Sequence, residues 1–527
     1  MSMYNQKTKR APEKIINHQG GEGFKLSPKL ELISLLATGI SGNKYYETLD
    51  DRSKRLLELV GKVAKTPKDI EFVAKALVYT RSVIGQRSVT HLGAVGLVPH
   101  LSGMELGKRF FSKRNRKAET GGIVHRLDDM LEIAAAYFHF NPGKPLPGAI
   151  KKGFRNALEH ADTYELAKYQ GKGKAISLVD IVNLVHPRPE DNMIEVFEKL
   201  MKGNLTQFNT VEDKNTKSGQ EVAAKVISGE ITKTEAEVQV KQAKKENFSE
   251  LISTRKIGYF ALIRNLRNIL KAGINADTID DVVAMLTDKK LIKQSLIFPH
   301  QIDIAMEIMV AEGVKIPLKI LKAIDTAYEL AVPNLAELFP DGNTAVVVDT
   351  SGSMWGMWGS GCKIGSVNLN KNPIEKAALI GATFAKGIGA DLFQFATTTQ
   401  GILFNRLDSI NTIKKTVINS QGKVGHGTNF GNIFAELNGT HYDRIFIISD
   451  LQGGDSIVSG SSYQSYKKKY GMPYIYTVDI QGYGSTMFKQ EKKVCQLYGY
   501  GQDIYEMAKK VELDPRALLK EIEAIVI

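Results

Sequence analysis

The chain has 527 residues, of which 43% are hydrophobic and 24% charged, with a formal net charge of +13 and two cysteines. This composition excludes a mainly disordered chain and a disulfide framework, and no apolar run reaches the roughly 18 residues that a membrane span requires. Because the N-terminus also lacks an apolar stretch that could act as a signal peptide, we expect a soluble, cytoplasmic protein of about two to four domains.

The positive charge is concentrated in one part of the chain. Residues 1–340 hold 51 Lys and Arg against 40 Asp and Glu, whereas residues 341–527 hold 19 against 17. A basic excess confined to one part indicates either a polyanionic partner, most often a nucleic acid, or a surface that only keeps the protein soluble. The charge alone leaves both interpretations open.

Helical patterns dominate residues 25–340. Apolar side chains recur at helical spacing in residues 28–36, 69–80, 126–138, 147–158, 261–270 and 317–330. Short breakers such as Asn141-Pro142-Gly143 separate them, and no strand-like alternation of convincing length appears. The pattern predicts an all-α part, built either as a bundle or as a solenoid of stacked helix pairs. The charged stretch 204–250 fits a helical hairpin or a mobile insertion.

From Asn343 onward, strands alternate with helices. Strands are expected at 345–348, 392–395, 402–404, 444–449 and 473–478, with helices from about 373 and at 409–419, 431–437 and 463–469. Two short helices, at about 504–512 and 515–525, close the chain. This alternation predicts an α/β doubly wound parallel sheet with both faces covered, whose ligands sit at the carboxyl ends of the strands.

Oxygen-bearing side chains gather at that edge of the expected sheet. Asp349, Ser351 and Ser353 follow the first strand, Thr428 precedes a helix, and Asp450 ends the strand 444–449. Five hard oxygen donors suit one divalent cation, with Mg²⁺ expected and Mn²⁺ or Ca²⁺ as alternatives.

Asp-x-Ser-x-Ser with a distant Thr and a strand-end Asp resembles the metal-ion-dependent adhesion site of von Willebrand factor A domains, which implies such a domain at 341–527. In that family one coordination position stays open for an acidic group of a partner. Hydrolytic two-metal centres need more carboxylates than two, so we expect adhesion here and not catalysis. A metal-dependent nuclease with His426 as base is the enzymatic alternative. Trp355 and Trp358 either pack beneath the next helix or flank the metal.

Two basic clusters stand out in the helical part. Residues 108–117 include Lys108, Arg109, Lys113 and Arg114 around two phenylalanines. The second cluster, within 147–186, comprises Lys151, Lys152, Arg155, Lys168, Lys172, Lys174 and His186. Lysines on a Gly-spaced loop can follow a phosphate backbone and aromatic rings can stack on unpaired bases, although either cluster alone also fits a solvated surface.

Several segments resemble the TROVE module of Ro ribonucleoproteins. They are residues 17–24 (Asn-His-Gln-Gly-Gly-Glu-Gly-Phe), 166–169 with 180–187, 259–266, and Phe298-Pro299-His300. The resemblance covers most of residues 17–335 in the family's order, and a von Willebrand A domain follows, as it does in Ro proteins. It implies HEAT-like helical repeats closed into a ring over residues 1–340.

The resemblance also implies ligands. Ro proteins bind small noncoding Y RNAs on an outer basic surface and single-stranded 3′ ends of misfolded RNAs in the central hole. The family's RNA contacts match Lys168, one of Lys172 or Lys174, and His186. Leu178-Val179 and Asn183 replace basic residues of the family, which shifts the expected contacts toward Lys151, Arg155 or residues 108–117.

The leading hypothesis is a monomeric, noncatalytic RNA-binding scaffold that presents RNA to a 3′–5′ exoribonuclease or another acidic partner at the metal site. No HExxH, GxSxG, Walker or CxxC motif occurs in the sequence. The alternative is a metal-dependent protein–protein adhesion module without an RNA role.

Overall fold

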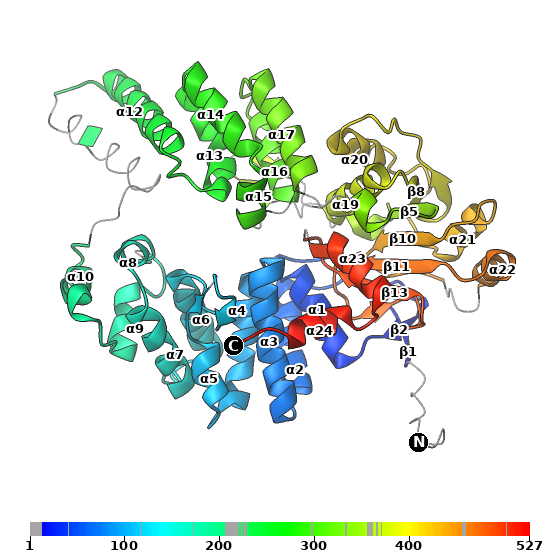
Figure 1. Cartoon of the computed structure of the whole chain (residues 1–527), viewed down its shortest axis with the longest axis horizontal. Helices are drawn as coiled ribbons and strands as arrows, with labels where there is room; N and C mark the ends of the chain where they lie inside the picture. The colour runs from blue at the N-terminus through cyan, green and yellow to red at the C-terminus, as the bar shows by residue number, and fades with distance from the viewer. Residues whose placement is uncertain are drawn as a thin grey trace. The chain divides into compact units, whose positions relative to one another are not determined.

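A computed structural model gives the structure of the chain (Figure 1). It describes residues 13–40, 42–115, 117–171, 173–205, 221–222, 225, 228, 230–295, 297, 299–331, 335–355, 362–364, 367–369, 372–455, 460–501 and 503–527. Among the residues discussed above, Arg116, Lys172, Phe298 and Trp358 lie outside this description.

The described residues fall into two compact units, neither of which is continuous in sequence. The α/β unit comprises those within 1–52, 333–360 and 371–519, and the helical unit those within 53–332, 361–370 and 520–527. The expected boundary at 340/341 marks the change from helices to strands. Each terminus belongs to the unit formed mainly by the other part of the chain: residues 1–52 belong to the α/β unit, and residues 520–527 belong to the helical unit.

Helices dominate the helical unit, as expected, and two small two-stranded sheets, β3 (Arg114–Asn115) with β4 (Thr120–Gly121) and β6 (Cys362–Ile364) with β7 (Val367–Leu369), also belong to it. Their bounds are α2 Leu49–Val63 (which begins in the α/β unit), α3 Pro67–Tyr79, α4 Ser88–Leu97, α5 Glu105–Phe110, α6 Leu127–Phe140, α7 Gly148–Glu159, α8 Thr163–Lys168, α9 Leu178–Val185, α10 Ile194–Met201, α12 Lys233–Ser253, α13 Tyr259–Ala272, α14 Ala276–Leu286, α15 Lys289–Ser295, α16 Pro299–Ala311 and α17 Leu318–Leu330. Within the described part of the chain, none of the helices has the length and apolar character needed to cross a membrane. The charged stretch 204–250 contributes most of α12.

A buried ion network joins the first helices of this unit. The carboxylate of Asp129, on α6, accepts hydrogen bonds from Arg81 Nη2 at 3.1 Å and Arg87 Nε at 3.0 Å. His91 Nε2, on α4, lies 3.0 Å from the same carboxylate. Arg81 belongs to a five-residue π-helical turn, Thr80–Ile84, that extends α3. One carboxylate thus fixes α3, α4 and α6 together.

The α/β unit contains the expected sheet, with strands in the order β13-β11-β10-β5-β8-β9. Their bounds are β5 Thr344–Asp349, β8 Asp391–Phe395, β9 Thr399–Gly401, β10 Arg444–Ser449, β11 Tyr474–Asp479 and β13 Val494–Tyr498. Five of the strands are parallel, and the edge strand β9 runs antiparallel to β8. The strand expected at 402–404 is therefore displaced to β9, and β13 was not anticipated.

Both faces of this sheet are covered, as its strand sequences require. In β5, Val347 belongs to the core under α21 (Gly431–Leu437) and α22 (Ser461–Tyr470). Val348 points to the other face, where a Cβ on Gly381 of α19 (Pro373–Gly387) would approach its side chain to 2.5 Å. Phe446 of β10 stacks on Phe384 of α19 at 4.2 Å between ring centroids. The remaining helices are α1 Pro28–Thr38, α18 Leu335–Leu338, α20 Ile410–Ile418, α23 Asp503–Leu513 and α24 Ala517–Glu523.

The N-terminal segment is part of the α/β unit. β1 (Lys14–Ile16) and β2 (Glu22–Lys25) form a hairpin that pairs with β12 (Ser485–Thr486). The Gly-Gly pair in its turn has a steric reason, because a Cβ on Gly21 would lie 2.2 Å from the carbonyl oxygen of Gly453. The hairpin therefore rests on the loop that follows β10.

Candidate metal site and basic surfaces

The metal loop begins where β5 ends. Asp349 is the last residue of β5, and Ser351 and Ser353 follow it into a 3₁₀ turn at Gly352–Trp355. The backbone N–H of Ser351 donates to Asp349 Oδ1 at 2.9 Å, and the hydroxyl of Ser449 donates to Oδ2 at 2.5 Å. The hydroxyl oxygens of Ser351 and Ser353 lie 3.4 Å apart. These bonds fix one carboxylate and two hydroxyls on a single turn.

Two neighbouring loops bring the other expected ligands to the same edge. Asp450 directly follows β10, the strand paired with β5. The loop carrying Thr428 is tied to the metal loop, since the backbone N–H of Gly352 donates to the carbonyl of His426 at 2.9 Å. All five expected ligands are buried. The side chain of His426 is exposed, so the structure adds nothing to its assignment as a base.

The two carboxylates of this site lack a compensating cation. No Lys, Arg or His of the described residues forms an ion pair with Asp349 or Asp450, and Oδ2 of Asp450 is buried without a hydrogen-bond partner. Burial raises the pKa of Asp349 to about 6. Burial and the charge of Asp349 raise the pKa of Asp450 well above its ordinary value. Two buried like charges destabilise the loop unless a cation offsets them.

The residues present therefore fit a divalent cation held by oxygen donors. A hard cation favours carboxylate and hydroxyl ligands, and the unpartnered oxygen of Asp450 is free to coordinate it. Among the described residues, no group of three or more His, Cys, Asp or Glu side chains is placed to hold a metal ion. Any cation here would thus be held by two carboxylates together with the neutral hydroxyls.

Side chains from the N-terminal segment line this edge. Tyr46 hydrogen-bonds to Gln19 and stacks on His18 at 5.1 Å between ring centroids. The backbone N–H of His18 donates at 3.0 Å to Oε1 of Gln452, and Gln452 follows Asp450 by two residues. Burial and the charge of Asp450 raise the pKa of Tyr46, which places its ring beside the site. Sequence reasoning did not assign Tyr46, because no local pattern links it to Asp450.

Trp355 ends the metal loop and is bonded to it. Its indole N–H donates to the carbonyl of Thr350 at 3.3 Å, and its side chain is half-buried. This bond braces the turn that carries Ser351 and Ser353. Trp358 lies beyond the described part of this loop.

Lys168 is the centre of a cationic and aromatic cluster on the helical unit. Its ammonium lies 5.1 Å from the ring centroid of Tyr164 and 5.5 Å from that of Tyr169. The guanidinium of Arg126 lies 5.6 Å from the Tyr169 ring. We call Lys168, Tyr164, Tyr169 and Arg126 the Lys168 cluster. Lys168 and Tyr164 are exposed, and their i, i+4 spacing in α8 was a signal that sequence reasoning could have used for Tyr164.

His186 stands exposed at the end of α9. Ser177 and Asp180 form the capping box that begins this helix, and His186 ends it in a left-handed conformation with φ 48°. Arg155 Nε donates to the carbonyl of Val185 at 2.8 Å, so Arg155 braces the turn that presents His186. Ser177 and Asp180 thus have a structural role at the start of α9.

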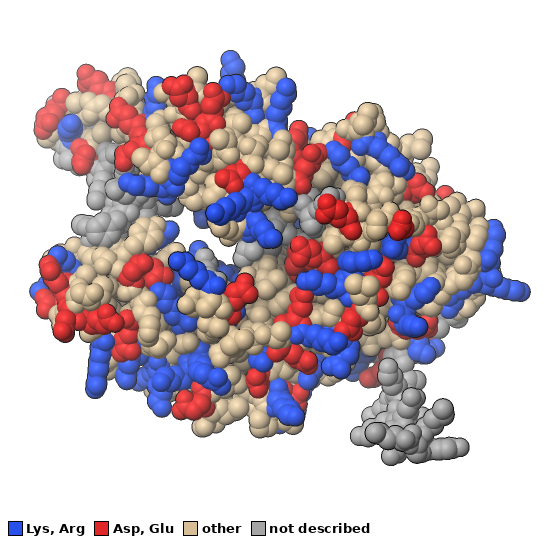
Figure 2. Space-filling view, viewed as in Figure 1, with Lys and Arg blue, Asp and Glu red and all other residues tan. Residues whose placement is uncertain are grey.

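Lys108 and Lys152 line one hollow of about 470 Å³ between α5 and the start of α7. Both side chains are exposed, and Lys151 beside them is half-buried. Figure 2 shows Lys and Arg side chains gathering over α5 and α7. The structure thus brings together one residue of the 108–117 cluster and one of the 147–186 cluster. Lys174, on the loop after α8, lies 3.7 Å from Glu132 as a partly exposed ion pair.

Three residues of the 108–117 cluster bind the protein's own backbone. Arg114 is buried, and its guanidinium donates to the carbonyls of Gly121, Glu119 and Val526 at 2.6–2.9 Å. Lys113 bonds to the carbonyl of His160 and pairs with Glu165. Arg109 donates to the carbonyl of Ile527 at 3.3 Å but stays exposed. The expectation that Arg114 and Lys113 contact RNA stays a prediction, and the fold already engages donors of both side chains.

Comparisons with known proteins found similarity to TROVE-containing proteins over parts of the chain. A model of the TROVE domain matches residues 230–314, which hold α12 to α16. Telomerase protein component 1 of Mus musculus is 23% identical over 340 residues, which cover 52% of this chain and 12% of that protein. The Ro (RSR) protein of Deinococcus radiodurans matches with a TM-score of 0.48 and 15% identity, over 95% of this chain and 100% of that chain.

Residues 230–314 are thus similar to the TROVE domain, the module that the sequence motifs resemble. The matched stretch contains the segment 259–266 but not Lys168 or His186. The chain spans only 12% of the mouse relative, so that protein's role is not transferred to it.

Proposed function

We propose that this protein is a noncatalytic RNA-binding scaffold of the Ro ribonucleoprotein type. The Lys168 cluster is the observation that carries the proposal: an exposed ammonium stands beside two tyrosine rings, next to a second cation. Cations bind phosphates, and exposed aromatic rings stack on unpaired bases. Lys174, His186 and the Lys108–Lys152 hollow lie on the same unit and supply further cationic or imidazole groups.

The proposed ligands are a small structured, Y-like RNA on this surface and the single-stranded 3′ ends of misfolded RNA within a ring of HEAT-like repeats. The protein would present such RNA to a 3′–5′ exoribonuclease. Support for this comes from the TROVE match and from the basic excess of residues 1–340.

At the carboxyl edge of the sheet we propose one divalent cation, Mg²⁺ in the first instance, in a von Willebrand A-type adhesion site. Asp349, Ser351, Ser353, Thr428 and Asp450 would hold it, and their burial and the unpartnered oxygen of Asp450 support this. The cation supplies a Lewis-acidic position that accepts an acidic side chain of a partner protein. Ser449 and Gln452 hold the two carboxylates in place.

The test separates phosphate contacts from base stacking. RNA affinity of the full chain is measured against salt concentration with a stem-loop RNA that has a single-stranded tail. Lys168→Gln should weaken binding and reduce the salt slope by about one, because one phosphate contact is lost. Tyr164→Ala should weaken binding by about 1–3 kcal/mol at an unchanged slope, because stacking releases no counterions.

Lys423→Gln, on an exposed loop of the α/β unit, is the matched charge control and should change neither quantity. The proposed function is contradicted if RNA affinity does not depend on salt. It is also contradicted if Lys168→Gln and Lys423→Gln have the same RNA affinity and the same salt slope.

A further inference from the structure

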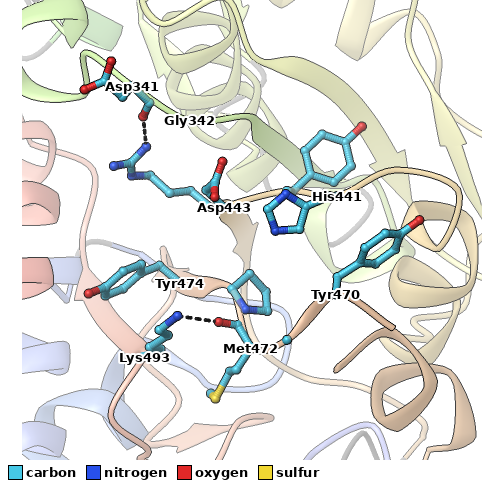
Figure 3. A pocket seen from close by; sticks show the side chains of 12 residues that line it. Asp341, Gly342, His441, Asp443, Tyr470, Met472, Tyr474 and Lys493 are labelled. Carbon is cyan, nitrogen blue, oxygen red and sulfur yellow. Dashed lines mark hydrogen bonds between the residues drawn. The ribbon is translucent and has the colours of Figure 1, made fainter. Parts of the chain in front are cut away.

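A second cavity lies at the opposite edge of the sheet from the metal loop. It encloses about 370 Å³ where β10 and β11 begin, and all its lining residues belong to the α/β unit (Figure 3). Six-residue strands separate it from the metal edge by about 17 Å. Its size falls in the range of small-molecule sites.

Aromatic rings form the walls of this cavity. Figure 3 shows Tyr474 and Lys493 on one side, His441 and Tyr470 on the other, and Met472 between them. The rings of His441 and Tyr470 are 5.7 Å apart between centroids. Two walls of this kind, above an apolar floor, suit a flat aromatic ligand that stacks on them.

A carboxylate with spare acceptor capacity stands over these walls. Oδ2 of Asp443 accepts the backbone N–H of Asn343 at 2.8 Å, and the second oxygen has no hydrogen bond with any described residue. The carboxylate of Asp341, on the rim, is likewise unbonded among the described residues. Among the described residues Arg444 forms no ion pair with either carboxylate, and its guanidinium is bonded to Glu512 and to the backbone of Asp341.

The surroundings of the cavity are cationic. Lys493 Nζ donates to the carbonyl of Met472 at 2.8 Å, and an ammonium has two further donors. The last turn of α22 carries Lys467, Lys468 and Lys469 directly before Tyr470. Figure 2 shows Lys and Arg side chains gathered over α22. This charge attracts a phosphate and repels a basic peptide.

We infer that this cavity binds a guanine nucleotide, with the base stacked on Tyr474 and Tyr470, its edge bonded to Asp443, and its phosphate near Lys493. Guanine presents N1–H and the exocyclic N2–H₂ as adjacent donors, which pair with a carboxylate. Adenine, cytosine and uracil have an acceptor beside their donor at this edge, which a carboxylate opposes. A free guanine nucleotide and a guanosine within single-stranded RNA present the same base groups, so either could be the ligand.

The experiment is calorimetric titration of the full chain with GMP, AMP, CMP and UMP. We expect GMP to bind about tenfold more tightly than the others, as a carboxylate pair to one base allows. Asp443→Asn should remove this preference, since its amide turns a donor toward the guanine donors. Tyr474→Leu should weaken binding of every nucleotide, and Asp408→Asn, elsewhere on the same unit, should change nothing.

Two single-stranded oligoribonucleotides that differ in one G identify the source of the ligand. Tighter binding of the G-containing oligomer than of GMP indicates RNA, and equal binding indicates a free nucleotide. The inference is overturned if neither GMP nor this oligomer loses affinity in Asp443→Asn, or if arginine amide binds as tightly as GMP. It does not depend on the proposed function, because the Lys168 variants leave this cavity intact.

Discussion

Asp349 and Asp450 are two buried carboxylates at the ends of adjacent strands. They accept hydroxyl and amide hydrogen bonds, and no Lys, Arg or His of the described residues forms an ion pair with them. Because each charge is removed from water, their mutual repulsion opposes folding. The edge of the sheet is therefore prepared for an ion that the chain does not itself supply.

We expect Asp450→Asn to raise the melting temperature of the metal-free chain by a few degrees, because one of the two like charges disappears. The same variant should lose its stabilisation by Mg²⁺, which in wild type amounts to about 2.7 kcal/mol at 100 times the Kd. Thermal unfolding with and without Mg²⁺ measures both effects. Asp408→Asn is the control, and an undiminished Mg²⁺ response of Asp450→Asn would exclude this residue as a ligand.

At the scale of elements, the Asp129 network is the strongest constraint on the helical unit. Burial alone would raise the pKa of Asp129, but the hydrogen bond from His91 and the charges of Arg81, His91 and Arg87 hold it well below its ordinary value. The ionised carboxylate therefore stabilises the fold. Its contribution is complete above the unfolded pKa of about 3.9 and is lost as pH falls through the lower folded pKa.

Asp129→Asn should accordingly cost about 3–5 kcal/mol at pH 7, since it leaves the buried Arg81 guanidinium, Arg87 and His91 without their shared carboxylate. Below pH 4 the cost should shrink, because the unfolded wild-type chain then binds a proton at Asp129 that the folded chain does not bind. Urea unfolding followed by circular dichroism at pH 7 and pH 3.5 checks this. A cost that does not change with pH would mean that the carboxylate's charge contributes nothing.

The elements also show what sequence could predict. Helices such as α7 and α17 follow from apolar spacing, and β5 and β10 follow from runs of buried β-branched residues. β13 was missed because Val494–Tyr498 mixes polar and apolar residues. β9 was displaced because Thr399–Gly401 has no apolar pattern and takes its place by pairing with β8.

The candidate sites divide in the same way. The proximity of the expected metal ligands was predictable because parallel strands end at one edge, so Asp349 and Asp450 meet although they are far apart in sequence. Charge spacing could not reveal that Arg114 is buried against backbone carbonyls, since burial depends on tertiary packing. The cavity around Asp443 unites loops that no motif connects.

At the scale of the whole molecule, the chain exchanges its ends between units. Residues 1–52 complete the α/β unit, and residues 520–527 belong to the helical unit, where the carbonyl of Val526 accepts from Arg114 at 2.9 Å. The basic excess lies in residues 1–340, most of which belong to the helical unit. This distribution favours the helical unit for the proposed RNA binding, and adhesion stays a proposal for the sheet edge.

Native purification followed by extraction and sequencing of bound nucleic acid tests the central claim, RNA binding by this protein, most directly. We predict a discrete small RNA with a stem, which is lost when Lys168, Lys174 and His186 are replaced together and retained in Asp450→Asn. Protein free of RNA, with no salt-sensitive binding to added RNA, would contradict the account and leave metal-dependent adhesion as the function to pursue.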